Sequence, residues 1–320
     1  MSKVGAGKYI YTLRYDWAKL PEGESFGAVT DVAGDSKNRI YVLQRKDPPV
    51  VIFDHRGNYL GSWGSGMFNR AHSIHIENDL VYLTDSDDSV CLIYTLNGRP
   101  TQVLGNRGIH SDTGSNTYGA LVPKAGGPFN HPTKLVPAPW GELYVSDGEI
   151  NCRIHRFTRD GHLINSWGEP GKMEPYQFHM PHSVLIDKNK VYVCDRENSR
   201  IHVYSAIGQF ISMWTDLRPP TDICVDKDGL FYVSQFAFNI THRYSEYPPP
   251  TGSGSALRDS EGLRTIRPDA PPQISILYGH GEVITQWESR KAHGLWVDSR
   301  GNIYSALEDD RSVDKYVRQS

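Results

Sequence analysis

Three histidines stand at equivalent positions in a repeated strand–turn–strand pattern, and their type and spacing would suit a metal site. His72 opens "HSIHIENDLVYLTD", His182 opens "HSVLIDKNKVYVCD" and His293 opens "HGLWVDSRGNIYSAL". Three imidazoles that converge on one point bind a divalent transition metal and leave positions open for water or substrate; zinc is the commonest such occupant. For any one of them alone, a histidine that only caps a turn is the alternative, but the matched trio favours the metal site.

The same pattern occurs three more times with threonine in place of histidine. Each copy is 14 or 15 residues long and consists of a strand, a polar turn and a second strand rich in aromatic and β-branched residues. The first positions alternate along the chain in the order Thr30, His72, Thr133, His182, Thr221 and His293. If the six copies form a ring, every second copy brings one imidazole to the same height around a threefold axis.

The spacing of the copies predicts a six-bladed β-propeller. After most copies comes a third strand and then a fourth with its own signature, as in "GNYLGSWG" (57–64) and "GHLINSWG" (161–168). Units of four strands that recur 39 to 72 residues apart are typical of propeller blades with insertions. The last unit ends at Ser320 after three strands, so we expect residues 8–17 to supply its outer strand and close the ring. The predicted fold class is therefore all-β, with a single domain over residues 1–320.

Two insertions rich in proline, glycine and serine interrupt the blades. Residues 106–128 separate the second and third units, and residues 244–273 separate the second and third strands of the fifth. Their composition predicts loops. In a propeller, the loops that enter the first strand of a blade and those that join its second and third strands open on the same face. We therefore expect both insertions on the histidine face, with 244–273 as a lid.

Three charged residues follow second strands and are therefore expected on the histidine face. Arg45 follows "YVLQ", Glu149 follows "YVSDG" and Arg196 follows "YVCD". Two arginines and one carboxylate beside a metal suit an anionic substrate and a general acid or base. Each of them alone could equally be a solvated charge at a loop tip.

The composition argues against several other classes of protein. The 34 Lys and Arg residues against 37 Asp and Glu give a net charge of −3, so we expect no nucleic acid and no membrane as partner. The N-terminus has no apolar signal region, and no apolar run is long enough to cross a bilayer. Cys91, Cys152, Cys194 and Cys224 lie in predicted strands without metal-binding spacing, as expected of buried free thiols. We expect a cytoplasmic protein that acts on a small, anionic molecule, and we predict no particular oligomeric state.

The repeats resemble those of the six-bladed NHL-type propellers and, among them, the α-hydroxyglycine amidating lyase (peptidylamidoglycolate lyase) domain of peptide-amidating enzymes. The likeness is densest in "FNHPTKLVPAPWGELYVSDGEINCRIHRF" and "FHMPHSVLIDKNKVYVCDRENSRIHVY", and it continues in "KAHGLWVDSRGNIYSAL". The NHL pattern alone is shared with propellers that only bind protein or RNA. The three-histidine register together with "DREN" is more specific.

The resemblance implies a role for each candidate residue. His72, His182 and His293 match the family's zinc ligands, and Arg45 and Arg196 match the two arginines that hold the carboxylate and carbonyl oxygens of its substrate. The family reaction cleaves the C–N bond of an N-acyl carbinolamine and yields an amide and glyoxylate. The resemblance thus implies a metal-dependent lyase that acts on a small α-hydroxy acid derivative.

This chain departs from the family at two positions. Glu149 stands where the family has a tyrosine proposed as the base, and a glutamate within hydrogen-bond reach can serve as a general base. Gly294 stands where an aspartate follows the third zinc histidine and contributes to a structural calcium (Ca²⁺) site, so we expect that site to be incomplete. We also expect no oxidising domain of the kind that usually accompanies the lyase, and therefore no amidated peptide hormone as the product.

Two other functions stay open at this stage. On the same scaffold, a metal-dependent hydrolase or hydratase would use Glu149 to activate water. A non-catalytic NHL interaction platform would hold no metal and would tolerate alanine at the three histidines. Solvent oxygen enters the product of a hydrolase but not that of a lyase, so labelling with ¹⁸O distinguishes these two enzymes.

Overall fold

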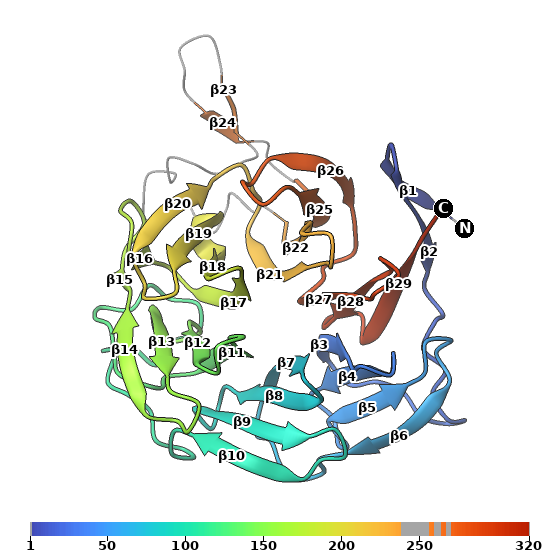
Figure 1. Ribbon diagram of the computed structural model, residues 1–320, viewed down its shortest axis with the longest axis horizontal. Coiled ribbons are helices and arrows are strands. Elements are labelled where there is room, and N and C mark those ends of the chain that lie inside the picture. The colour runs from blue at the N-terminus through green and yellow to red at the C-terminus, as the bar shows by residue number, and fades with distance from the viewer. Residues whose placement is uncertain (1, 238–255, 259–263, 267–269, 320) are drawn as a thin grey trace.

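The computed structural model describes residues 2–237, 256–258, 264–266 and 270–319. These residues form six antiparallel sheets arranged as blades around a common axis (Figure 1). Helical structure in this part of the chain is limited to a single 3-10 turn, Arg196–Asn198. The all-β, six-bladed propeller predicted from the repeats is confirmed. Among the described residues no helix is both long and apolar enough to span a bilayer.

The first three blades each contain four strands that follow one another from the axis outward. The first blade contains β3 (Val29–Gly34), β4 (Ile40–Gln44), β5 (Val50–Phe53) and β6 (Tyr59–Trp63). The second contains β7 (Ala71–Glu77), β8 (Leu80–Asp85), β9 (Val90–Thr95) and β10 (Pro100–Leu104). The third contains β11 (Pro132–Pro137), β12 (Leu143–Asp147), β13 (Arg153–Phe157) and β14 (Leu163–Trp167).

The other three blades continue in the same order around the axis. The fourth contains β17 (Pro181–Asp187), β18 (Lys190–Asp195), β19 (Arg200–Ser205) and β20 (Phe210–Trp214). The fifth contains β21 (Pro220–Val225), β22 (Phe231–Gln235), β25 (Gln273–Leu277) and β26 (Val283–Glu288). The sixth contains β27 (Gly294–Val297), β28 (Ile303–Leu307) and β29 (Ser312–Arg318), joined by β2 (Tyr9–Arg14) and β1 (Lys3–Ala6).

The burial of the strands follows from this stacking. Strands β4, β12, β22 and β28, the second strands of their blades, are buried at every position because neighbouring blades cover both of their faces. The outer strands β6 and β14 begin with exposed residues. One cluster of apolar side chains lies between each pair of neighbouring blades, so the core is distributed around the ring.

The ring is closed by the N-terminal segment, as predicted. Strand β2 pairs antiparallel with β29, with Tyr11 opposite Arg318 and Arg14 opposite Lys315. The outer strand predicted at 8–17 is thus observed over Tyr9–Arg14. The short strand β1, which pairs with β2 at the outer edge, was not predicted.

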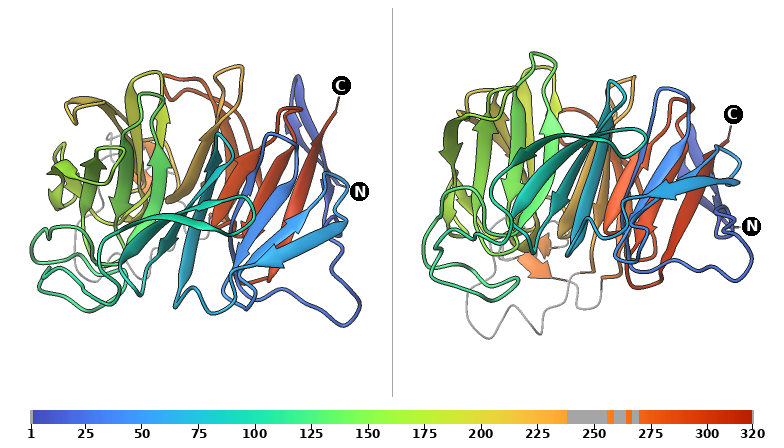
Figure 2. Two further views of the ribbon diagram at one scale, coloured as in Figure 1. Left: turned by 60° about the horizontal axis from the view of Figure 1, so that its bottom comes forward. Right: turned by 90° about the horizontal axis from the view of Figure 1, so that it is seen from below.

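The two insertions differ in how much of them the structure describes. Residues 106–128 form loops without strands, and Figure 2 shows these green segments at one face of the ring. Of the predicted lid 244–273, residues 244–255, 259–263 and 267–269 lie outside the described part of the chain. Within it, β23 (Ala256–Arg258) pairs with β24 (Arg264–Ile266). A further short pair, β15 (Glu169–Pro170) and β16 (Gln177–Phe178), lies between the third and fourth blades.

Candidate metal centre

A β-bulge at the start of each inner strand sets the direction of the side chains at the axis. The pairing register shifts across one residue in each of five inner strands: Thr30, His72, Thr133, His182 and Thr221. In the sixth blade, the His293 amide donates to the carbonyl of Ala306, which also stands opposite Gly294. His293 and Gly294 thus both face Ala306, which is the arrangement of a β-bulge. A bulge bends its strand and re-aims side chains, so the repeat brings the same position of every blade to the axis.

Each of the three histidines is oriented by a threonine of the next blade. The carbonyl oxygens of Thr133, Thr221 and Thr30 lie 2.8, 2.7 and 2.7 Å from the Nδ1 atoms of His72, His182 and His293, respectively. A carbonyl oxygen can only accept, so each Nδ1 carries the proton. The alternation of threonine and histidine read from the sequence therefore corresponds to three inter-blade hydrogen bonds of one kind.

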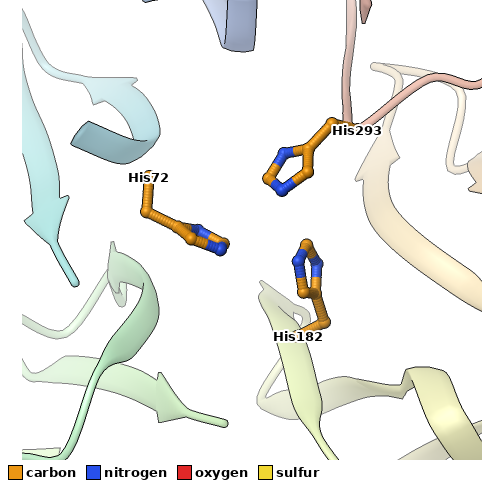
Figure 3. A group of neighbouring side chains, drawn as sticks. All are labelled: His72, His182 and His293. Atoms are coloured by element: carbon orange, nitrogen blue, oxygen red, sulfur yellow. The ribbon is translucent and has the colours of Figure 1, made fainter. Parts of the chain in front are cut away.

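The remaining ring nitrogens converge on the axis. Figure 3 shows the rings of His72, His182 and His293 pointing toward one another from three separate segments of the chain. Their ring centroids are 4.8–4.9 Å apart, and one ring nitrogen of each lies within 4.8 Å of the others. The three residues are almost wholly buried, with 2, 3 and 6% exposure. In a neutral imidazole whose proton is on Nδ1, the Nε2 atom carries a lone pair, so three neutral rings would present three converging lone pairs.

This donor set fits a divalent transition metal. Neutral imidazole is the commonest metal ligand, and a backbone acceptor on the other ring nitrogen is the usual support that fixes its tautomer. The Nε2 atom of His182 is buried and has no hydrogen-bond partner within the described residues, an arrangement that is costly for a buried polar atom. A cation at the point of convergence would satisfy all three lone pairs.

The protonation state of the histidines also suits a metal. Burial lowers the pKa of His72 to about 4, because the contact with Glu149 raises it only in part. Burial and the neighbouring His182 and His72 rings hold the pKa of His293 well below its ordinary value. Both rings are therefore neutral at pH 7, and the neutral ring is the form that coordinates metals.

Glu149 lies directly beside the convergence point. Its Oε1 atom is 3.2 Å from Nε2 of His72 and 3.6 Å from Nε2 of His182. Gly148 allows this approach, because a Cβ there would lie 2.3 Å from the carbonyl oxygen of Pro181, the residue before His182. Burial alone would raise the pKa of Glu149, but the contacts with His182 and His72 and the charge of Arg196 outweigh it and hold the pKa well below its ordinary value. Oε1 of Glu149 and the Nε2 atoms of His72 and His182 thus lie close enough to share one positive charge, which a proton or a bound metal ion would supply.

Arg196 flanks Glu149 on the side of the fourth blade. Its Nη1 atom is 3.9 Å from Oε1 of Glu149, and its Nε atom donates to Glu197 at 3.0 Å. The guanidinium lies over the ring of Phe236, 5.5 Å from its centroid. The aromatic face and the two carboxylates hold this cation at the edge of the site, where it can meet an anionic ligand.

Arg45 holds a corresponding position on the opposite side of the axis. Its Nε atom donates to the carbonyl of Ala71, the residue before His72, at 3.1 Å, and its Nη1 atom pairs with Glu308. The other carboxylate oxygen of Glu308 is 3.9 Å from Nε2 of His293. Two Arg–Glu pairs, Arg196 with Glu149 and Arg45 with Glu308, therefore flank the three histidines from opposite blades.

The structure thus brings all six predicted site residues together, namely His72, His182, His293, Arg45, Glu149 and Arg196. It adds two that the sequence reading missed, Glu308 and Phe236. Both are the first residue after the second strand of their blades, in "YSALE" and "YVSQF". The rule that found Arg45 and Arg196 would have found these two if it had been applied to every blade.

The insertion 106–128 contributes backbone contacts to this site. The amide of Gly119 donates to the carbonyl of Glu149 at 3.2 Å, and its carbonyl lies 3.0 Å from Nε2 of His179. Tyr118 packs against the ring of His131 and beneath the guanidinium of Arg70. This loop therefore covers the histidine face over the second to fourth blades.

The position of the family's calcium-binding aspartate is closed in this chain. A Cβ at Gly294 would lie 2.2 Å from Oδ1 of Asp31, so no side chain fits there while Asp31 keeps its place.

Comparisons with known proteins agree with this architecture. The NHL repeat profile matches residues 178–204, in the fourth blade. Human NHL repeat-containing protein 3 is 28% identical over 264 residues, 77% of this chain and 72% of that protein. Peptidyl-alpha-hydroxyglycine alpha-amidating lyase 1 of Drosophila melanogaster is 28% identical over 251 residues, 66% of this chain and 44% of that protein. The chain carries an NHL repeat and resembles the amidating lyases. It spans less than half of the fly lyase.

Solved structures with similar folds are also propellers. A streptogramin B lyase structure superposes with a TM-score of 0.60 at 11% identity and covers 97% of this chain and 98% of that one. A virginiamycin B lyase from Staphylococcus aureus, in an inactive variant solved with quinupristin, gives a TM-score of 0.59 at 15% identity, with 96% and 99% covered. At such identities the likeness concerns the fold alone.

Proposed function

We propose that this protein is a metal-dependent carbon–nitrogen lyase that cleaves a small N-acyl carbinolamine derived from an α-hydroxy acid. The observation that carries the proposal is the convergence of three Nε2 lone pairs, each fixed by an Nδ1–H···O=C bond, beside the Glu149 carboxylate. Relatives named as amidating lyases support a lyase-like propeller, and a metal held by this donor set would give that scaffold a reactive centre.

His72, His182 and His293 would hold the metal, and zinc is the ion that such a set most often binds. When bound, the metal would act as a Lewis acid on a substrate oxygen and make its hydroxyl proton easier to remove. The rigid backbone acceptors on the Nδ1 atoms would keep the three rings in place through the reaction, because each ring is fixed by a neighbouring blade.

Arg45 and Arg196 would bind the anionic end and the acyl oxygen of the substrate. Both guanidinium groups are largely buried, with 15% and 14% of the side chain exposed, and each is already held by a carboxylate. Charged donors fixed in this way lose little entropy when a ligand carboxylate arrives. Their places on opposite sides of the histidines suit a substrate that spans the axis.

Glu149 would act as the general base. It takes the proton of the α-hydroxyl group, the C–O bond becomes a carbonyl, and the C–N bond breaks with its electron pair moving to the amide nitrogen. The nitrogen then receives the proton from the Glu149 carboxylic acid. The products are a primary amide and an α-oxo acid, and no water is consumed.

The test is product analysis with N-benzoyl-α-hydroxyglycine as the probe, in water enriched in ¹⁸O. We expect benzamide and glyoxylate in equal amounts, no ¹⁸O in benzamide, and no turnover by the His182→Ala variant above the spontaneous rate. Labelled benzoic acid would instead identify a hydrolase. No turnover by the zinc-incubated wild type would contradict the lyase for this substrate class.

A non-catalytic interaction platform is the second candidate. Human NHL repeat-containing protein 3, which aligns over 77% of this chain, has a name that gives no activity. An interaction platform does not require three converging imidazoles. If the protein is such a platform, alanine at His72, His182 or His293 should change neither metal content nor partner binding. The same variants therefore separate the two candidates.

A further inference from the structure

A second layer of polar side chains lies one residue along from the threonines that orient the histidines. Asp31, Lys134 and Asp222 directly follow Thr30, Thr133 and Thr221 in the first, third and fifth blades. We call these three residues the axial triad. They are buried, with 2, 6 and 2% exposure, although two of them are carboxylic acids and the third is an amine.

Lys134 holds the triad together. Its Nζ atom lies 2.6 Å from Oδ1 of Asp222 and 3.4 Å from Oδ2 of Asp31. Buried charges are costly unless they are paired and hydrogen-bonded, so two buried carboxylates this close need a cation between them. In this chain the cation is part of the protein.

The two carboxylates bind the strands of all three histidines. Oδ2 of Asp31 accepts the amide of Ile74, two residues after His72, at 3.0 Å. Oδ1 of Asp222 accepts the hydroxyl of Ser183, the residue after His182, at 2.7 Å. Oδ2 of Asp222 accepts the amide of Leu295, two residues after His293, at 2.9 Å. Each metal-site strand is thus tied to the triad within two residues of its histidine.

The even-numbered blades leave room for the triad. Their residues in the same layer, Ser73, Ser183 and Gly294, are small, and Gly294 is in contact with Asp31 as described above. Beyond the triad lies a cavity of about 230 Å³ whose lining is mostly aliphatic. The lining includes Lys134 but none of the three histidines, so the triad separates this cavity from the candidate metal centre.

We propose that Lys134 is a positioning residue for the metal centre: its ammonium group is an internal cation that fixes Asp31 and Asp222, and through them the three histidine strands. The inference rests on the proposed metal site, although the hydrogen bonds that it uses do not involve a metal. Groups that support metal ligands typically change metal affinity by about 10- to 100-fold when removed.

The experiment compares Lys134→Met with wild type and with Lys227→Met as the matched control. Methionine keeps most of the length of the lysine stem and removes the charge, and Lys227 is an exposed lysine paired with Asp228. Cobalt(II) titration, followed by visible absorption, reports metal affinity and ligand geometry. NMR spectra of the imidazole nitrogens in the metal-free protein report the positions and tautomers of the three histidines.

We expect Lys134→Met to weaken cobalt binding at least tenfold, to alter the absorption bands and to shift the imidazole signals, while Lys227→Met changes none of these. The inference would be overturned if folded Lys134→Met kept the cobalt affinity, the visible absorption bands and the imidazole signals of wild type. If that variant does not fold, Asp222→Asn provides the same comparison, because it weakens the pairing and keeps the size of the side chain. If wild type itself binds no cobalt, the proposed metal site fails, and the imidazole shifts of the metal-free protein decide the inference on Lys134 alone.

Discussion

Replacing Glu149 with glutamine tests the catalytic role assigned to this carboxylate. Glutamine has the same shape, so it fits the buried place 3.2 Å from His72 and 3.6 Å from His182, but it cannot take up a proton at the pH of the reaction. Loss of a general base typically costs about 10²- to 10⁴-fold in rate. We therefore expect kcat to fall by that factor, which corresponds to about 2.7–5.4 kcal/mol in the activation free energy.

The metal content of the Glu149→Gln variant should stay at about one ion per chain, because the three histidines provide the ligand set. The assay is steady-state release of the amide from N-benzoyl-α-hydroxyglycine, with metal analysis on the same preparation. Glu308→Gln is the matched control: it lies at the opposite side of the site, 3.9 Å from His293, and pairs with Arg45. We expect it to act mainly on KM.

Two results would refute the reasoning on Glu149. A kcat within threefold of wild type would show that the carboxylate is not the base. Loss of the metal together with activity would show that Glu149 is a fourth ligand and that the base lies elsewhere.

Three further predictions follow from the same geometry. Arg45→Lys removes the guanidinium group that contacts both the Ala71 carbonyl and Glu308. The KM for a carboxylate-bearing substrate should therefore rise about tenfold or more, and the KM for the corresponding neutral amide should change less in the same assay. His72 should increasingly destabilise the metal-free protein as the pH falls from 6.5 to about 4, because the unfolded chain protonates His72 in this range while the folded chain, with a pKa of about 4, does not. The expected loss in the free energy of unfolding is on the order of 3 kcal/mol, measured by urea unfolding as the difference between wild type and His72→Asn. Burial raises the pKa of Asp31 to about 7, so Asp31 changes the free energy of unfolding in the opposite direction, but it does so in both proteins. A pH-independent difference would contradict the burial of a neutral His72. Gly294→Ala should cost about 1–3 kcal/mol in thermal unfolding, because its Cβ would lie 2.2 Å from Asp31 Oδ1, whereas Gly279→Ala, with a nearest contact of 3.5 Å, should be close to neutral.

Much of the fold could be predicted because the repeat constrains it. Six copies of one strand–turn–strand pattern imply six equivalent sheets, and the sixth copy, with three strands of its own, is completed by β2. Local pattern cannot show an edge strand such as β1, whose pairing with β2 depends on the place where the ring closes. The extent of the lid 244–273 likewise stays a prediction.

The site could be predicted as far as its residues share a position in the repeat. His72, His182 and His293 share the first position of the repeated pattern, and Arg45 and Arg196 share the position directly after its second strand. The bulge that turns the first positions toward the axis leaves no separate signal in the sequence, because it arises from pairing with the second strand.

Contacts between blades are what the sequence could not supply. Lys134 and Asp222 are 88 positions apart and form an ion pair only because alternate blades meet at the axis. Nothing in "PTKLV" marks its lysine as buried, and lysine is seldom buried without a partner. Glu308 illustrates the opposite case, since its position after the second strand was available in the sequence and was passed over.

The most direct test of the account is the metal content of purified protein, prepared without a metal-binding tag and measured by inductively coupled plasma mass spectrometry. Wild type, His182→Ala and His75→Ala are compared; His75 lies on the same strand as His72 but outside the converging trio. We predict about one zinc or similar divalent ion per chain in wild type and His75→Ala, and a loss of that ion in His182→Ala while circular dichroism shows the fold intact. Wild type that takes up no metal after reconstitution, or His182→Ala that keeps a full equivalent, would contradict it.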